Sequence, residues 1–386
     1  MSEYSAIVGD FYNDQPIELP AVTYNRGVIN TRDTVSVRRS VRQQTVTEDE
    51  VMANIADIEW EVIESGSSRF EVGLLNHRTK RHDAMLHLST YSSSLSGNPG
   101  NAYELAYQAA VNPTIPQVYV ATPGNGGSSD WKPREREYAR QTGRLTREDE
   151  DRTRALPTIQ DLVGALITKE IVVTRLGTDS AGSVMGVAIG SELAEGQITD
   201  TVFNSHPQLT EISPLSLALR QLILEGVINA SKTRKDTPDQ WPVSKERMLM
   251  VKAARPDIYT IALSTMTTSE RIRTLWTSAV ILAHGFDSTN DPLTHDLGAF
   301  IRQQPEAKIN FMVGEHDPLY SRKLDSNVRL LIHYFEGTFA RVVTIPGMTH
   351  AFNTYYPQLY QAIKTRLLNL PADDYTTPAY FTIPDY

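Results

Sequence analysis

One serine lies where a predicted strand turns sharply into a predicted helix. The β-branched, apolar run at residues 171–176 is typical of a strand, and the small-residue stretch from residue 183 is typical of a helix. Ser180 lies between them in the segment GTDSAG, with small residues two positions to either side. A tight strand-to-helix turn admits only small side chains at these positions and projects the hydroxyl at its apex. The spacing predicts a nucleophile elbow, in which the backbone N–H of Ala181 donates to an oxyanion.

The partners that such a serine needs follow two later strand-like runs. A serine hydroxyl is a weak nucleophile at neutral pH and requires a base that a carboxylate orients. Asp317 follows the apolar run 309–313, in VGEHDPLY. His350 follows the run 342–345, in IPGMTHAF. Because active groups gather at the carboxyl ends of strands in an open parallel sheet, we expect Ser180, Asp317 and His350 to meet there.

Strand-like and helix-like segments alternate along the parts of the chain that carry these residues. The alternation runs through residues 51–206 and resumes over 300–370, and it predicts an α/β fold with a mostly parallel central sheet flanked by helices. Residues 207–299 read as mainly helical, which favours an inserted helical lid or cap over the site. Residues 1–50 are polar and predict an extended N-terminal arm, and residues 371–386 form a C-terminal tail rich in proline and aromatic side chains.

Composition excludes several classes of site. The 386-residue chain has no cysteine, so disulfides, thiolate metal sites and a thiol nucleophile are excluded. Its formal net charge is −9, and acids interleave the basic residues, which argues against nucleic-acid binding. The nine histidines show no spacing typical of a metal-ligand set, so no metal or other cofactor is expected. No apolar run is long enough for a membrane span and no signal peptide is evident, so we expect a soluble protein, cytoplasmic or virion-associated.

The three motifs together resemble those of the α/β-hydrolase superfamily, from about Ile58 to Leu370. GTDSAG resembles the nucleophile elbow, GEHDPL the acid turn and PGMTHAF the histidine loop. VYVATPGNGGSSD is similar to the loop after the fourth strand, and MLHLSTYSSS then occupies the third strand and the oxyanion loop. The resemblance implies a second oxyanion N–H from Tyr91 or Ser92. Two positions depart from the family pattern: Thr178 stands where glycine is commonest, and Ser-Thr at residues 89–90 where His-Gly is common.

Each motif also has an ordinary structural interpretation. A serine in a Gly/Ala-rich turn is usually a turn residue or a helix N-cap. An Asp-Pro pair is common in simple turns, and a histidine after a strand is commonly a surface or packing residue. The interpretation as a triad depends on three such segments occurring in the order Ser, Asp, His, each after an apolar strand.

These observations favour a serine hydrolase, a carboxylesterase or lipase-like enzyme that acts on a small-molecule or lipid-like ester through an acyl-enzyme. They do not choose between ester, thioester and amide substrates. The alternative is a structural or adaptor subunit of a larger assembly, for example a phage virion or tail protein, built on a hydrolase fold with or without esterase activity. Its basis is the arm and the tail, which suit a homo-oligomer or a larger assembly.

Overall fold

The computed structural model describes a defined part of the chain, namely residues 22–23, 32–33, 46–77, 83–88, 94–96, 98–133, 157–204, 245–259, 296–314, 338–345, 364, 367–368 and 380–382.

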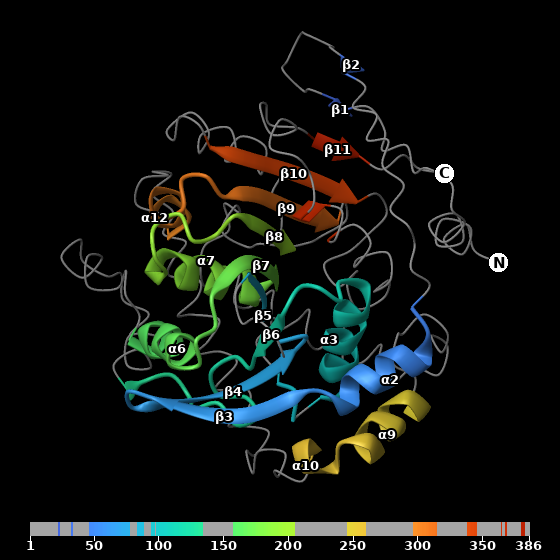
Figure 1. Cartoon of the computed structure of the whole chain (residues 1–386). Coiled ribbons are helices and arrows are strands. Elements are labelled where there is room, and N and C mark those ends of the chain that lie inside the picture. Colours follow the sequence, from blue (N-terminus) through green and yellow to red (C-terminus); the bar gives the residue numbers. More distant parts are fainter. Residues whose placement is uncertain are drawn as a thin grey trace.

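Within the described ranges, a nine-stranded sheet crosses the molecule in the order β11-β10-β9-β8-β7-β5-β6-β4-β3 (Figure 1). Its strands, in chain order, are β3 (Glu59–Ser65), β4 (Ser68–Leu75), β5 (Ala84–Leu88), β6 (Gln117–Val120), β7 (Val173–Asp179), β8 (Asp200–Asn204), β9 (Lys308–Gly314), β10 (Phe339–Ile345) and β11 (Tyr380–Thr382). β4 is antiparallel to β3 and to β6, and every other neighbouring pair is parallel. The parallel strands therefore present their carboxyl ends at one edge of the sheet, as the sequence predicts.

The antiparallel end of the sheet is a hairpin with a turn rich in glycine and serine. Ser65 pairs with Ser68, so the loop contains only Gly66 and Ser67. Gly66 has φ +58°, a left-handed conformation that glycine adopts without a Cβ penalty. The turn fixes the register of β3 against β4.

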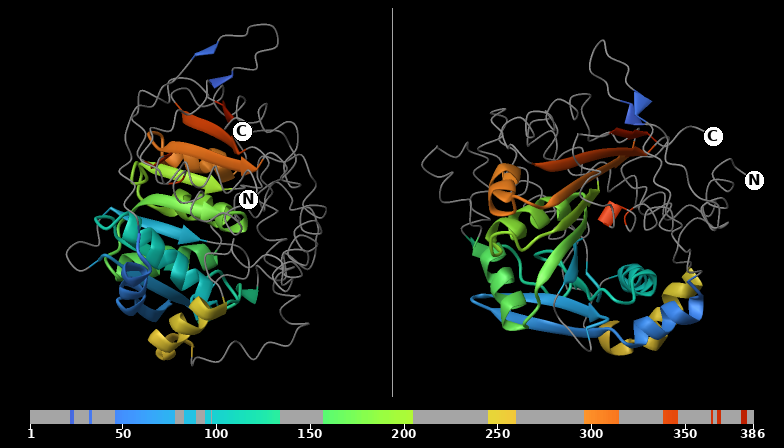
Figure 2. Two further views of the ribbon diagram at one scale, coloured as in Figure 1. Left: turned by 90° about the vertical axis from the view of Figure 1, so that its right-hand side faces the viewer. Right: turned by 45° about the horizontal axis from the view of Figure 1, so that its top comes forward.

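Helices cover both faces of the sheet (Figures 1 and 2). One face carries α6 (Pro157–Thr168), α7 (Ala181–Glu192) and α12 (Asp296–Gln303), and the other carries α3 (Pro99–Val111) with α2 (Glu48–Ala56) packed against it. This arrangement is the predicted α/β-hydrolase fold, with a mostly parallel sheet between two helical layers. α2 begins at Glu48, within the last residues of the predicted arm, where Thr47 and Glu50 form a capping box.

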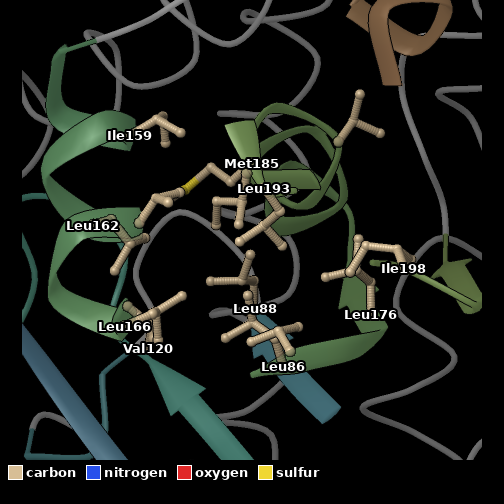
Figure 3. Close-up of a cluster of buried hydrophobic side chains, with 14 of the residues drawn as sticks. Leu86, Leu88, Val120, Ile159, Leu162, Leu166, Leu176, Met185, Leu193 and Ile198 are labelled. Carbon is tan, nitrogen blue, oxygen red and sulfur yellow. The ribbon is translucent and has the colours of Figure 1, made fainter. Parts of the chain in front are cut away.

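The layer between the sheet and the α6–α7–α12 helices is a continuous apolar core. Strand side chains alternate between the two faces, so every second residue of β5, β6 and β7 points into this layer. Figure 3 shows part of it, and its members include Leu86, Leu88, Val120, Ile159, Leu162, Leu166, Leu176, Met185, Leu193 and Ile198.

The described part of the predicted lid begins with two helices that dock beside α2 and α3. These are α9 (Lys245–Ala254) and α10 (Pro256–Tyr259). Val251 and Ile258 are buried against the α2–α3 layer, and the Arg255 guanidinium donates to the carbonyl oxygens of Ile55 and Ile58. The insertion is therefore anchored beside the N-terminal helix. Residues 296–299 of the predicted lid begin α12, which packs against α7 in the core, and the other residues of 207–299, with the predicted cover over the site, lie outside the described ranges.

The two chain ends contribute short strands. β1 (Val22–Thr23) pairs with β2 (Arg32–Asp33), and β1 also contacts β11. β11 comes from the proline-rich tail and adds to the edge of the sheet in parallel with β10, at Val342–Thr344. None of the helices in the described part of the chain combines the length and the hydropathy that a membrane span requires.

Candidate active site

Ser180 forms the whole of the turn between β7 and α7. The sequence predicts a loop from residue 178 to residue 182, whereas the strand continues to Asp179 and the helix begins at Ala181. Ser180 has φ +50° and ψ −119°, outside the regions that L-residues ordinarily occupy. Such a conformation costs about 1–3 kcal/mol and persists only where the surrounding structure imposes it. The corner is tighter than predicted, and its serine is held in a strained backbone conformation.

Comparison with other helix starts in this chain distinguishes Ser180 from an ordinary N-cap. Thr47 and Asn98 precede α2 and α3 with extended backbones, and their side chains accept hydrogen bonds from the backbone N–H groups of Glu50 and Gly100. The Ser180 side chain makes no such cap bond, although it holds the same position relative to α7. Helix capping therefore does not explain this serine.

Asn204, the last residue of β8, holds the elbow in place. Its carbonyl oxygen accepts from the Ser180 N–H at 2.7 Å and from the Ser183 hydroxyl at 3.2 Å. Its side-chain Nδ2 donates to Oδ1 of Asp179 at 2.9 Å. One residue of the neighbouring strand thus binds the residue before the serine, the serine itself and the first turn of the helix.

Thr178 fits in place of glycine because the facing helix residue is a glycine. Thr178 is fully buried on the α7 side of β7. A Cβ added to Gly186 of α7 would lie 3.0 Å from Cγ2 and 3.3 Å from Oγ1 of Thr178, closer than ordinary van der Waals contact. Gly186 on the helix therefore provides the space that a glycine at position 178 of the strand would otherwise provide. Oγ1 of Thr178 is buried and has no hydrogen-bond partner among the described residues.

Of the other predicted site residues, only Ala181 lies within the described ranges. Ala181 opens α7, and an N–H in the first turn of a helix has no partner within that helix, so it is available to an oxyanion. Tyr91, Ser92, Asp317 and His350 lie outside the described residues. β9 and β10, the strands that precede Asp317 and His350, are parallel to β8 and follow it in order across the sheet.

The face of the sheet beneath α3 holds buried polar groups next to the elbow. His87 of β5 pairs in register with Gly177 of β7, and both face α3. The Lys364 ammonium donates to the Gly177 carbonyl oxygen at 2.9 Å and lies 3.5 Å from Nδ1 of His87. Nε2 of His87 lies 2.5 Å from Oε1 of Gln117, which requires the proton on Nε2 and leaves Nδ1 as an acceptor. Lys364 and His87 are 1% and 4% exposed.

The environment of this face shifts the pKa values of its ionisable groups. Burial, then the Lys364 charge, lowers the pKa of His87 to about 3, which keeps the imidazole neutral. Burial, then the charge of Asp179, raises the pKa of Glu104 in α3 to about 7, and Lys364 opposes the rise. Burial lowers the pKa of Lys364, while the charges of Asp179 and Glu104 act in the opposite direction. One ammonium thus faces two carboxylates, and the second of them titrates near neutrality.

Glu71 of β4 joins two loops at the same edge of the sheet. It is fully buried, and its carboxylate accepts from the N–H groups of Leu95 at 2.6 Å, Ser96 at 2.9 Å and Gly127 at 2.8 Å, and from the Ser96 hydroxyl. These loops follow β5 and β6. Four donors bind this buried carboxylate. Glu71 thus connects the segment that follows the predicted oxyanion loop to the glycine-rich turn.

Three of these residues have roles that the sequence analysis does not predict: Asn204, Lys364 and Glu71. The sequence around Asn204 indicates a special position, since it is a polar residue at the end of an apolar strand, one place before a serine. Glu71 lies in an otherwise apolar run, FEVGLL, where a charge marks either an exposed position or a buried role. Lys364 is part of a helix pattern rich in polar residues and gives no signal of burial.

Among the described residues, no group of three or more histidine or acidic side chains is arranged to hold a metal ion.

Comparisons with known proteins found similar folds among solved structures only. No family model matches the chain, and no curated protein matches its sequence. Solved structures with similar folds include an α/β-hydrolase fold protein from Chitinophaga pinensis, with 12% identity, TM-score 0.46 and coverage of 82% of this chain and 100% of that one. An enol-lactonase from Burkholderia xenovorans has 15% identity, TM-score 0.45 and coverage of 80% and 100%. The thioesterase domain of the curacin biosynthetic pathway has 15% identity, TM-score 0.46 and coverage of 80% and 99%.

Proposed function

We propose that this protein is a serine hydrolase of the carboxylesterase or lipase-like kind, with Ser180 as its nucleophile. The observation that carries the proposal is the backbone of Ser180, strained at φ +50° and ψ −119° and without a helix-capping role. A strained conformation that stability does not require is a reason to look for a functional role. A nucleophile elbow supplies that role, since it presents the hydroxyl beside the first N–H groups of a helix.

In the proposed mechanism, Ser180 Oγ attacks the carbonyl carbon of an ester while His350 takes the hydroxyl proton. Asp317 orients His350 and stabilises the imidazolium. The Ala181 N–H and an N–H from Tyr91 or Ser92 hold the oxyanion of the tetrahedral intermediate. The intermediate collapses to an acyl-enzyme as His350 protonates the leaving alcohol, and water attacking the acyl carbon restores the serine.

A turnover assay with matched serine variants tests this proposal. Ser180→Ala should lower hydrolysis of a p-nitrophenyl ester by more than about 1,000-fold, because it removes the group that forms the covalent intermediate. Ser183→Ala, three residues on and also buried, should retain most of the activity, since it loses one hydrogen bond to the Asn204 carbonyl. His350→Gln and Asp317→Asn should behave like Ser180→Ala. Comparable turnover by Ser180→Ala and the parent protein would refute the proposal.

A second candidate role, as a component of an assembly, is favoured by the two chain ends. β11 extends the edge of the sheet with only three residues, and β1 contacts it. Main-chain N–H and C=O groups at the edge of a sheet are the groups to which a strand from a neighbouring chain can add. Size-exclusion mass with and without residues 1–45 and 371–386 tests this role. A full-length oligomer that becomes a monomer on truncation supports it, and a monomer in both cases counts against it.

A further inference from the structure

A buried lysine and its counter-charges lie directly behind the elbow. We call this set the α3-face cluster, defined as His87, Glu104, Asp179 and Lys364. Gly177 and Asp179 are two residues apart on β7, so they point to the same face of the sheet, and this is the face that holds Lys364. Asp179 is 4% exposed and immediately precedes Ser180. The cluster therefore surrounds the last residues of the strand that carries the nucleophile.

Glycine at position 177 makes the approach of Lys364 possible. A Cβ added there would overlap Cε of the lysine side chain and would lie 2.8 Å from its Nζ. The Nζ donates to the Gly177 carbonyl oxygen at 2.9 Å, three residues before Ser180. The partners come from positions 187 residues apart in the sequence, so this contact joins a residue from the C-terminal part of the chain to the nucleophile strand.

The charge of Lys364 has a clear electrostatic consequence for the proposed reaction. Asp179 places a buried carboxylate one residue from Ser180, and a negative charge at that distance opposes the formation of an oxyanion on the substrate. The ammonium offsets this charge. Glu104 competes for the same ammonium, while His87 stays neutral and contributes only an acceptor at Nδ1. Tyr119 of β6 and Glu71 of β4 are the next ionisable groups along this face.

We propose that Lys364 is a positioning residue for the Ser180 nucleophile: its ammonium holds the Gly177 carbonyl of β7 and offsets the Asp179 carboxylate beside the reacting serine. This inference rests on the proposed function and deepens it. It assigns to Lys364 a role in the rate of attack by Ser180, in addition to its contacts with Gly177 and His87.

The test is the rate at which a fluorophosphonate probe labels Ser180, with ester turnover measured in parallel. Attack of Oγ on phosphorus forms a P–O bond and expels fluoride, while the hydroxyl proton passes to His350. Lys364→Met should slow labelling and kcat on the order of tenfold with KM changed less than twofold, because an unpaired buried charge acts on the transition state. Lys308→Met is the matched control, since the Lys308 ammonium pairs with Asp200 at the opposite, amino edge of the sheet. It should leave the labelling rate unchanged.

Glu104→Gln supplies a readout that a merely structural role would not change. In Lys364→Met, measured at a pH well above 7 where Glu104 is ionised, adding Glu104→Gln removes one of the two uncompensated charges and should restore part of the labelling rate. In the otherwise unaltered protein, Glu104→Gln leaves Asp179 as the only carboxylate in the cluster. The ratio of its labelling rate to that of the parent should therefore rise with pH through about 7, where Glu104 ionises. This second experiment holds even if Lys364→Met fails to fold.

The outcomes separate the two proposals. A parent protein that is folded but never labelled at Ser180 overturns the proposed function and this inference with it. Labelling of the parent with an equal rate in Lys364→Met, or a Glu104→Gln ratio that does not vary with pH, overturns the inference alone.

Discussion

The two faces of the sheet differ in what they bury. The face toward α6, α7 and α12 is filled by aliphatic and aromatic side chains, and the face toward α3 holds a lysine, a histidine, two carboxylates and a glutamine close to the elbow. Apolar burial is the main source of stability and is insensitive to pH, whereas buried charges contribute little net stability and respond to pH and to one another. We infer that the first face fixes the shape of the elbow and that the second adjusts the electrostatics at its serine.

The apolar face should show the largest effect on stability. Phe203 of β8 is fully buried next to Thr178 in register, and its ring lies 6.0 Å from Phe300 and 5.8 Å from Phe311. Phe203→Ala removes this packing and should lower the free energy of unfolding by about 3–5 kcal/mol. Urea denaturation provides the measurement, with Phe203→Leu as the milder control. A loss below about 1 kcal/mol would show that the site collapses and that this layer is not close-packed.

The α3 face should show its effect in the pH dependence of stability. The pKa of Glu104 is raised from 4.5 to about 7, so its contribution to stability is present below about pH 4.5 and is lost as the pH rises through about 7. Glu104→Gln should therefore gain stability relative to the parent as the pH increases across this window. Denaturation midpoints of the two proteins at several pH values test this. Parallel curves would contradict the raised pKa.

His87 provides the opposing control on the same face. Its pKa is lowered from 6.5 to about 3, so its contribution is present above about pH 6.5 and is lost as the pH falls toward 3. His87→Gln should lose less stability than the parent on acidification. A common slope for His87→Gln, Glu104→Gln and the parent would contradict both shifted pKa values.

A matched pair of threonines gives the smallest expected effect. The buried Thr178 hydroxyl has no hydrogen-bond partner in the described part of the chain, whereas the Thr201 hydroxyl donates to the Lys308 carbonyl oxygen at 3.2 Å, and both residues are fully buried. Thr178→Val should raise the free energy of unfolding by about 1 kcal/mol, and Thr201→Val should lower it by a similar amount. Equal shifts in thermal denaturation would indicate that the Thr178 hydroxyl is satisfied.

Local signals in the sequence predict much of this fold. The hairpin around Gly66, the strands up to Asp179 and the helix after Ser180 each follow from residues within a few positions, because turn chemistry and side-chain period act locally. The sequence also predicts the elbow, although the structure places its whole turn in one residue. Asp317, His350, Tyr91 and Ser92 remain predictions.

The buried polar contacts around Ser180 could not be predicted from local signals. Lys364 meets Gly177 across 187 residues, and the burial of a lysine depends on partners that only the folded chain brings together. Thr178 also could not be interpreted from the sequence. It departs from the family pattern, and the glycine that makes room for it, Gly186, lies on a different element, α7. Long-range pairs of this kind leave no periodicity or turn signal in the sequence.

The most direct test of the central claim is to locate a fluorophosphonate adduct on the folded, full-length protein by peptide mass spectrometry. We predict a single adduct on Ser180, retained in Ser183→Ala and lost in His350→Ala, since the base must accept the serine proton. A folded protein that takes up no probe, or an adduct on a different serine, would contradict the assignment of Ser180 as the nucleophile.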